Sequence, residues 1–171
     1  MKSAIILHGK PSRETYEDPS TPVPSQNHWL GWLRSELGQK GFVVSNPEAK
    51  EPYNPQYDLW QDAIAGLDID FETTLVGHSA GASFWLRYLS ENPTLNPEKL
   101  ILVAPWIDRS KYPDFFDFQI DADLSHRVLG AISIFNSLDD SAQVQNTVGE
   151  IQASLANVEL REFTNRGHFT L

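Results

Sequence analysis

The hydrophobic and polar positions of this chain fall into short apolar runs separated by longer segments with helical period. The apolar runs predict strands at Ala4–Leu7, Phe42–Ser45, Thr73–Val76, Leu100–Val103, Ala131–Phe135 and Val158–Phe163. The segments between them predict helices at Asn27–Gln39, Gln56–Leu67, Ser79–Ser90 and Ser141–Leu155. Strands that alternate with helices are typical of the α/β class. We therefore expect a mainly parallel sheet of about six strands, flanked by helices in a three-layer sandwich.

The last predicted helix carries its apolar side chains on one face. Apolar residues separated by four, three and four positions lie on the same side of a helix. In this segment they are Val144, Val148, Ile151 and Leu155. This face is expected to pack on the sheet.

Two segments do not follow the alternation. Residues 10–25 contain four prolines and no hydrophobic period, which predicts a surface loop. Residues 104–126 carry five aromatic side chains among acidic ones, and Pro105 and Pro113 prevent a long helix. This second segment is either a partial cap over one end of the sheet or a loop whose aromatic rings fill the edge of the core.

Composition and charge narrow the class of protein. The 171 residues, of which 40% are hydrophobic and 21% charged, are expected to form a single domain over residues 1–171. Thirteen basic and 23 acidic residues give a formal net charge of −10, which repels phosphate backbones and anionic lipid surfaces. We therefore expect neither a nucleic-acid partner nor a membrane partner.

Cysteine usage and the N-terminal pattern bear on location and chemistry. The chain contains no cysteine, which excludes disulfides, thiolate metal ligands and a cysteine nucleophile. The apolar run after Lys2 is too short for a signal peptide, and no segment has the ~20 apolar residues of a membrane span. These features predict a cytoplasmic protein whose chemistry uses oxygen and nitrogen groups.

The candidate nucleophile lies in the sequence GHSAG at residues 77–81, which directly follows a predicted strand. This is the pattern G-x-S-x-G between a strand and a helix, where the two glycines let strand and helix approach closely. The N-terminus of the helix supplies free N–H groups and a positive dipole that favour an oxyanion beside Ser79. We expect the backbone N–H of Ala80 to be the first oxyanion donor. The alternative is a glycine-rich turn in which Ser79 only caps the helix.

A serine hydroxyl needs a base that takes its proton, and this predicts a histidine. In this arrangement the chain order is serine, acid, histidine, so the base is expected well beyond Ser79. His126 and His168 both satisfy this order. We favour His168 because it follows the last predicted strand in a glycine-containing turn, whereas His126 lies in the irregular acidic segment. His8 and His78 are expected to pack or to form local hydrogen bonds.

The acid is expected after the penultimate strand, where the sequence has Asp139 and Asp140. Either carboxylate could orient the imidazole and stabilise the imidazolium, and one of them could instead cap the helix that begins near Ser141. A second oxyanion donor is expected in the loop after the first strand, where the candidate is the backbone N–H of Lys10. Gly9 beside it allows a close approach.

Neither a metal nor a cofactor is expected at this site. The histidines lack the spacing of metal ligands, and the chain has no phosphate-binding glycine loop and no dinucleotide motif. Trp29 and Trp106 are candidate walls of an apolar substrate pocket, whereas Trp32 is interpreted as a core residue. Lys10 or Arg13 near the mouth would favour a substrate that carries a carboxylate.

The motifs occur together in one known family. They are GHSAGA at residues 77–82, HW at 28–29 followed by GWL at 31–33, the Ser-x-Asp-Asp turn at 137–140 and GHF at 167–169. Together they resemble the small α/β-hydrolases of the retinoblastoma-binding protein nine type, a group of serine hydrolases. The resemblance covers nearly the whole chain and implies a compact α/β-hydrolase fold and turnover of small esters without a cofactor. It also implies Ser79, Asp140 and His168 as the catalytic residues, with Asp139 in reserve.

The chain departs from the family pattern at three places. The loop at residues 10–25 is longer than usual, and Ser141 stands where relatives often have proline. Only residues 169–171 follow His168, whereas relatives usually continue into a C-terminal helix. The namesake's partner binding uses a Leu-x-Cys-x-Glu motif, and this chain has no cysteine, so that interaction is not expected.

Two functions follow as hypotheses. The first is a serine hydrolase that cleaves a small carboxylic ester, or alternatively an amide or peptide bond, through an acyl-enzyme on Ser79. The second is a catalytically idle α/β-hydrolase fold that serves as a binding module, because a fold alone does not guarantee activity. Substitution of Ser79 by alanine separates them, since only an enzyme would lose its function.

Overall fold

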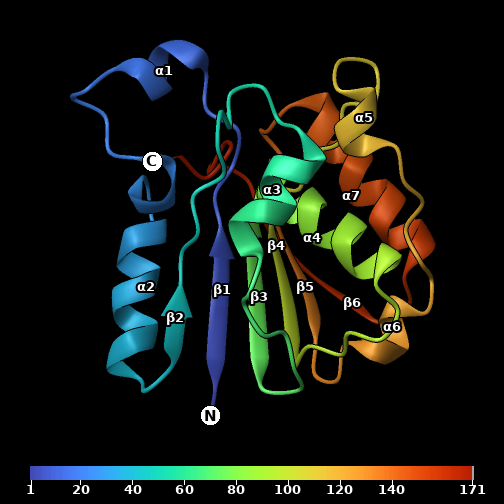
Figure 1. Ribbon diagram of the computed structural model, residues 1–171. Coiled ribbons are helices and arrows are strands. Elements are labelled where there is room, and N and C mark those ends of the chain that lie inside the picture. Colours follow the sequence, from blue (N-terminus) through green and yellow to red (C-terminus); the bar gives the residue numbers. More distant parts are fainter. Residues whose placement is uncertain (171) are drawn as a thin grey trace.

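Six strands form one sheet in the order β2-β1-β3-β4-β5-β6 in the computed structural model, which describes residues 1–170 (Figure 1). The strands are β1 (Ser3–Leu7), β2 (Val43–Ser45), β3 (Thr73–His78), β4 (Lys99–Val103), β5 (Ile132–Ser137) and β6 (Val158–Phe163). Each strand pairs with its neighbours in parallel. The predicted six-stranded sheet is confirmed, and all of its strands are parallel.

Helices cover both faces of this sheet. The longer ones are α2 (Leu30–Gln39), α3 (Tyr57–Ile64), α4 (Ala80–Glu91) and α7 (Ala142–Ser154). The connecting segments contain the short helices α1 (Arg13–Glu17), α5 (Pro113–Phe116) and α6 (Leu124–Arg127) and the 3₁₀ helix η1 (Pro24–Gln26). Hydrophobic contacts place α3, α4 and α7 on one face and α2 on the other, so the fold has three layers. None of the helices within residues 1–170 has the length and apolar character needed to cross a membrane.

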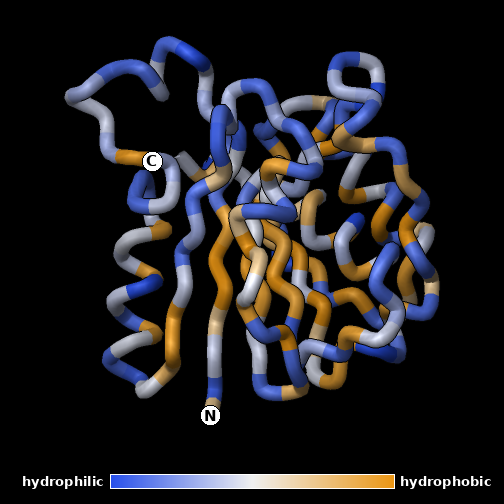
Figure 2. The backbone as a smooth tube through the Cα atoms, in the orientation of Figure 1, coloured by the Kyte–Doolittle hydropathy of each residue, from blue (hydrophilic) through white to orange (hydrophobic). Residues whose placement is uncertain are grey.

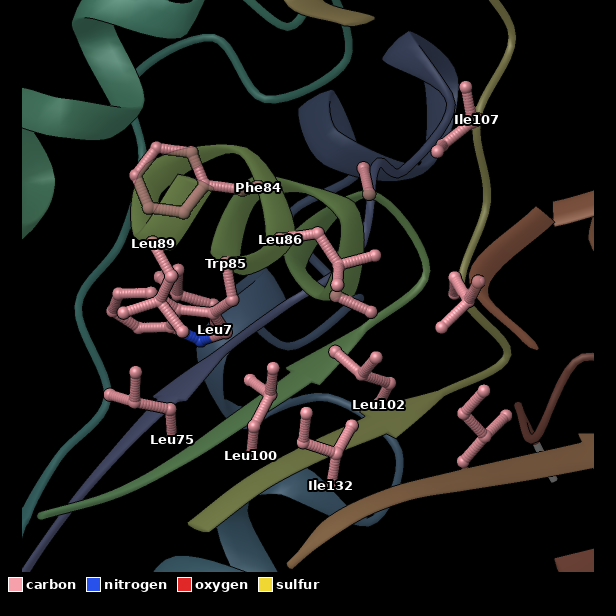
Figure 3. Packing of buried hydrophobic residues seen from close by; sticks show 14 of the residues in the cluster. Leu7, Leu75, Phe84, Trp85, Leu86, Leu89, Leu100, Leu102, Ile107 and Ile132 are labelled. Atoms are coloured by element: carbon pink, nitrogen blue, oxygen red, sulfur yellow. The ribbon is translucent and has the colours of Figure 1, made fainter. Parts of the chain in front are cut away.

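Successive side chains of the central strands point into two different cores. In β3, Leu75 belongs to the larger core under α4, and the next residue, Val76, belongs to the smaller core under α2. Figure 3 shows Leu86 and Leu89 of α4 near Leu100 of β4 in the larger core. Strands that are buried on both faces are apolar along their whole length, which explains why sequence alone located them. Figure 2 shows the same concentration of hydrophobic residues in the sheet.

The last helix behaves as its pattern predicts. The four apolar residues on its predicted face are all buried, and they are Val144, Val148, Ile151 and Leu155. Ser141 is the N-cap of α7 and accepts a hydrogen bond from the backbone N–H of Val144. The predicted helix at Asn27–Gln39 begins later, at Leu30, because His28 has a positive φ of 54° that interrupts helical geometry.

Residues 10–25 lie at the surface, but the prediction of a loop without helix is wrong for Arg13–Glu17. Ser12 caps α1 by accepting a hydrogen bond of 3.0 Å from the N–H of Thr15. Arg13 and Glu17 form an ion pair of 2.7 Å one turn apart. None of the residues of α1 is buried. An exposed helix needs no apolar face, so hydrophobic period could not reveal it.

The last residues of the segment at 104–126, in α6, lie near the opposite end of the sheet, but its part around α5 lies over the carboxyl ends of the strands (Figure 1). Phe115, Phe116 and Phe118 are buried in the larger core, and Trp106 and Tyr112 pack against it from partly exposed positions. The two interpretations of this segment therefore both hold: it covers that end of the sheet, and its phenylalanines fill the edge of the core.

Candidate active site

Ser79 lies in the sharp turn between β3 and α4, near the middle of the sheet (Figure 1). Its backbone has φ 55° and ψ −117°, a conformation that side-chain-bearing residues rarely adopt. Its N–H donates a 2.9 Å hydrogen bond to the carbonyl oxygen of Val103 at the end of β4. This bond helps to hold the strained turn, and such strain is common at functional sites.

The glycines on either side of Ser79 are required by close packing. A Cβ atom on Gly77 would lie 2.5 Å from the backbone of Ala82, and one on Gly81 would lie 2.8 Å from the carbonyl oxygen of Leu7. Both distances are below van der Waals contact and involve backbone atoms that cannot move aside. The strand and the helix therefore approach each other as the G-x-S-x-G pattern predicts.

Three side chains from three separate turns meet at the carboxyl edge of the sheet. The Nε2 atom of His168 lies 2.8 Å from the Oγ atom of Ser79, and its Nδ1 atom lies 2.7 Å from the Oδ2 atom of Asp140. Asp140 follows β5 and His168 follows β6. The hydroxyl, the imidazole and the carboxylate form one hydrogen-bonded row, in which Nδ1–H donates to Asp140 and Nε2 faces the serine hydroxyl.

Asp140 is enclosed, and both of its carboxylate oxygens have partners. Its side chain is 5% exposed. The Oδ1 atom accepts a 2.6 Å hydrogen bond from the N–H of Ser141, and the Oδ2 atom faces His168. The carboxylate is therefore fixed in the orientation that holds the imidazole.

Asp139 lies in the same turn but forms its hydrogen bonds with other groups. Its Oδ1 atom accepts hydrogen bonds from the hydroxyl of Ser137 at 2.5 Å and from the N–H of Gly167 at 3.0 Å. The hydroxyl of Ser137 in turn accepts a bond of 2.9 Å from the N–H of Arg166. These bonds lower the pKa of Asp139. Asp139 thus holds the turn that carries His168, and it is Asp140 that contacts the imidazole.

His78 and Trp29 also hold the segment around His168. The Nε2 atom of His78 lies 2.8 Å from the carbonyl oxygen of His168 and donates to it. The indole N–H of Trp29 donates a 3.0 Å bond to the carbonyl oxygen of Phe169. Burial lowers the pKa of His78 to about 3, so its ring is neutral at physiological pH. No sequence signal pointed to these bonds, because they join residues 90 and 140 positions apart.

Neither His8 nor His126 takes part in the row. His8 is buried, bonds to the carbonyl oxygen of Gly9 at 2.7 Å and accepts from the N–H of Ala49 at 3.1 Å, which is the local bonding that was expected. His126 is exposed on α6, near the opposite end of the sheet (Figure 1). The structure therefore separates His126 from Ser79.

The two expected oxyanion donors belong to segments that lie next to Ser79. Ala80 is the first residue of α4, where backbone N–H groups have no partner within the helix. Gly9 lies so close that a Cβ atom on it would be 3.0 Å from the Cβ atom of Ser79. Lys10 follows Gly9 and lines the cavities at Ser79. The loop that carries Lys10 and the first turn of α4 thus both lie beside Ser79, and the oxyanion role of the two N–H groups stays a prediction.

Two cavities share Ser79, His168 and Lys10. The first, of about 250 Å³, lies under the segment at residues 10–27, and its walls include Pro11, Tyr16, Pro22, Pro24, His28 and Leu30. The second, of about 310 Å³, is lined by Lys10, Ser79, Trp106, Asp140, Ser141 and His168. A carbonyl group at Ser79 would have space on both sides. The contribution of residues 10–27 was not expected from the sequence, because nothing in a proline-rich segment indicates what it covers.

The two predicted substrate-binding tryptophans differ in position. Trp106 lines the second cavity and packs edge-to-face on Tyr112, with ring centroids 5.8 Å apart. Trp29 is not among the residues that line either cavity, and its indole instead bonds to the backbone of Phe169. The interpretation of Trp32 as a core residue is wrong, because its side chain is 63% exposed on α2. Within residues 1–170 there is no cluster of three or more His, Asp or Glu side chains that could hold a metal ion.

Comparison with known proteins agrees with this arrangement. A family model described as "Serine hydrolase" matches residues 23–171. Serine hydrolase RBBP9 of Rattus norvegicus is 28% identical over 153 residues, which cover 82% of this chain and 77% of the rat protein. The structure of the ydeN gene product from B. subtilis is similar with a TM-score of 0.76 at 22% identity, over 99% of this chain and 88% of that one. Alpha/beta hydrolase domain-containing protein 10 from mouse gives a TM-score of 0.58 at 9% identity, over 96% of this chain and 81% of that one.

These similarities differ in what they establish. At such low identity the two solved structures indicate the fold, which is that of the α/β-hydrolases, as the sequence motifs implied. The family model covers most of the chain and includes Ser79, Asp140 and His168, and the rat relative confirms the resemblance first seen in the motifs. The chain belongs to the serine hydrolase family.

Proposed function

We propose that this protein hydrolyses small carboxylic esters through an acyl-enzyme formed on Ser79. One observation carries the proposal: Asp140, His168 and Ser79 form a continuous hydrogen-bonded row with distances of 2.7 and 2.8 Å. An imidazole that faces a serine hydroxyl on one side and a carboxylate on the other can accept the proton of the hydroxyl and remain stabilised as imidazolium. The small cavities beside Ser79 support a substrate of modest size.

The proposed reaction has two steps. In the first, Ser79 Oγ attacks the carbonyl carbon while His168 Nε2 takes the hydroxyl proton, and the N–H groups of Ala80 and Lys10 stabilise the oxyanion. The carbon–oxygen bond of the ester then breaks, and His168 returns the proton to the leaving alcohol. In the second step, water attacks the acyl carbon and gives a proton to His168. The bond from that carbon to Ser79 Oγ then breaks, His168 passes the proton to Oγ, and the acid leaves. An amide or peptide bond would follow the same steps with an amine as the leaving group.

Labelling with a fluorophosphonate tests the proposal without knowledge of the natural substrate. Such a probe phosphonylates a serine only when a base and an oxyanion site activate it. We expect an adduct on the peptide that contains Ser79, none in Ser79→Ala, and labelling of His168→Ala slowed by about a thousandfold or more. His126→Ala is the matched control, because it removes an exposed histidine on α6, and it should label at the normal rate.

The opposite result has an equally clear meaning. If the folded protein forms no adduct, or forms one that Ser79→Ala does not remove, the proposed hydrolase activity is wrong. The binding-module hypothesis would then account for the fold. The cytoplasmic location and the absence of nucleic-acid and membrane partners stay predictions from composition and charge.

A further inference from the structure

Lys10 has an unusual position among the charged residues of this protein. It is partly buried and lines both cavities that meet at Ser79. Its ammonium donates a long hydrogen bond of 3.3 Å to the carbonyl oxygen of Pro11. Across residues 1–170, no carboxylate lies within ion-pair distance of it. The ammonium therefore has unused hydrogen-bond capacity beside the reactive serine.

Within residues 1–170, none of the other ionisable groups that line the two cavities forms an ion pair with this ammonium. The Asp140 carboxylate is committed to His168 and to the N–H of Ser141. Burial lowers the pKa of His78 and of His28, which keeps both rings neutral at physiological pH. Arg13, the other cation considered from the sequence, is paired with Glu17 and is not among the lining residues.

The ring of Tyr112 lies close to the ammonium groups of two lysines. The ammonium of Lys10 lies 5.5 Å from the ring centroid of Tyr112, and that of Lys111 lies 5.6 Å from the same ring. Tyr112 packs on Trp106, which is part of the second cavity. Lys111 lies outside both cavities and beside Asp108, so the positive charge at the site comes from Lys10, in a chain with a net charge of −10. A site of one sign attracts ligands of the opposite sign.

We propose that the substrate of this site is an ester that carries a carboxylate, and that the ammonium of Lys10 binds this carboxylate while Ser79 attacks the ester carbonyl. The inference rests on the proposed ester hydrolysis and adds the class of substrate. Half-esters of short dicarboxylic acids are its simplest form, with the carboxylate on the acyl side. Esters of hydroxy acids place the carboxylate on the alcohol side.

Matched pairs of esters test the inference on each side of the scissile bond. The acyl-side pair is 4-nitrophenyl hemisuccinate and 4-nitrophenyl methyl succinate, and the alcohol-side pair is 4-acetoxybenzoate and its methyl ester. The quantity measured is the ratio of kcat/KM for the anionic ester to kcat/KM for the neutral one. A change of this ratio between variants reports on the carboxylate alone, because differences in leaving group and in oxyanion stabilisation cancel.

Three variants complete the experiment. Lys10→Met removes the charge and keeps a side chain of similar length, so the ratio should fall by about fivefold at low salt for at least one pair. Lys10→Arg keeps the charge and should restore most of the ratio. Lys40→Met removes an exposed lysine at the end of α2, outside both cavities, and should leave the ratio unchanged. Raising the salt concentration should reduce the ratio of the unmodified protein.

The failure of this inference is distinguishable from the failure of the proposed function. If Ser79-dependent turnover occurs but Lys10→Met lowers kcat/KM equally for both members of each pair, Lys10 does not recognise a carboxylate and the inference is overturned. Equal ratios in Lys10→Met and Lys40→Met would overturn it as well. If no ester is hydrolysed and no fluorophosphonate adduct forms, both the proposed function and the inference are wrong.

Discussion

His78 donates its Nε2–H to the carbonyl oxygen of His168, across 2.8 Å. The residue that precedes Ser79 in sequence therefore holds the backbone of the residue that hydrogen-bonds to Ser79. Because the ring of His78 is buried and neutral, it acts as a fixed donor. His78 is thus a positioning residue: it acts on the serine only through His168.

Substitutions of His78 should separate the hydrogen bond from the volume of the ring. We expect His78→Leu to destabilise the protein by about 1–3 kcal/mol, since it leaves a carbonyl oxygen without its buried donor. The same change should lower kcat for ester hydrolysis by about tenfold with little effect on KM, because His168 loses its fixed orientation. In His78→Gln an amide N–H can replace Nε2–H and should recover most of kcat. Urea unfolding and steady-state kinetics check both effects, and equal kcat values for the two variants would contradict a positioning role.

The stability of the protein should fall below pH 6.5. Burial lowers the pKa of His78 from 6.5 to about 3, and it also lowers the pKa of His8. The unfolded chain therefore binds more protons than the folded one between these two values, so the free energy of unfolding decreases as pH falls through that range. Above pH 6.5 the imidazoles are neutral in both states and the contribution is constant. The slope should reach about 1.4 kcal/mol per pH unit for each such histidine.

Urea titrations from above pH 6.5 toward pH 3 measure this slope. His78→Gln should reduce it, because one of the contributing groups is removed. His126→Gln, which replaces an exposed histidine on α6, is the control and should leave the slope as it is. A protein whose stability does not change over this range would show that His78 is protonated in the folded state.

Substitution of Asp140 should mainly lower kcat, whereas substitution of Asp139 should mainly lower the stability of the protein. Asp140→Asn should lower kcat by about 10³- to 10⁴-fold with a small change in stability, since it removes the charge that stabilises the imidazolium. Asp139→Ala should destabilise the protein, since it releases the bonds to Ser137 and Gly167. Its effect on kcat should be the smaller of the two. Kinetics and urea unfolding of both variants decide the matter, and the reverse order of the kcat values would identify Asp139 as the acid.

Two substitutions of glycine by alanine should change the stability of the protein in opposite directions. Gly81→Ala brings a Cβ atom to within 2.8 Å of the carbonyl oxygen of Leu7 and should destabilise the protein by about 3 kcal/mol or more. Gly149→Ala, on the exposed side of α7 with no neighbour within 4 Å, should stabilise it by about 0.5–1 kcal/mol. Thermal unfolding measures both. A tolerated Gly81→Ala would mean that β1 and α4 pack less closely than described.

The segment at residues 10–27 should control which acyl chains are accepted. Tyr16 of α1 lines the first cavity and is 38% exposed. Tyr16→Ala enlarges this cavity, so the preferred 4-nitrophenyl ester should shift toward longer acyl chains, with a change in stability within about 0.5 kcal/mol. Trp32→Ala removes another exposed aromatic, from α2, and should not shift the preference. An unchanged chain-length profile in Tyr16→Ala would place the acyl chain in the second cavity.

Sequence patterns predicted the features of the fold that depend on residues close together along the chain. Leu75 and Val76 lie in an unbroken apolar run because β3 is buried on both faces, and Ser79 follows in a motif whose glycines are dictated by local packing. The order of serine, acid and histidine then left His126 and His168, and the glycine-containing turn after the last predicted strand favoured His168. The helix α1 was missed because an exposed helix carries no hydrophobic period.

These local patterns could not predict contacts between residues that are far apart in the sequence. His78 and His168 are 90 positions apart, and Trp29 and Phe169 are 140 apart. Their hydrogen bonds depend on how β3, β6 and α2 are arranged in space, which no local spacing encodes. The different roles of Asp139 and Asp140 also depend on distant residues. Both aspartates fit the turn, and only their contacts with Gly167 and His168 distinguish them.

The exposed helix α1 also bears on how such a protein can diversify. Residues 10–27 wall the first cavity, yet α1 contributes no buried side chain to either core. The segment that we expect to shape substrate choice is therefore largely separate from the part that stabilises the fold. Insertions, deletions or substitutions there can alter selectivity at little thermodynamic cost, which makes this segment the natural target for evolving new substrate preferences while Ser79, Asp140 and His168 remain in place.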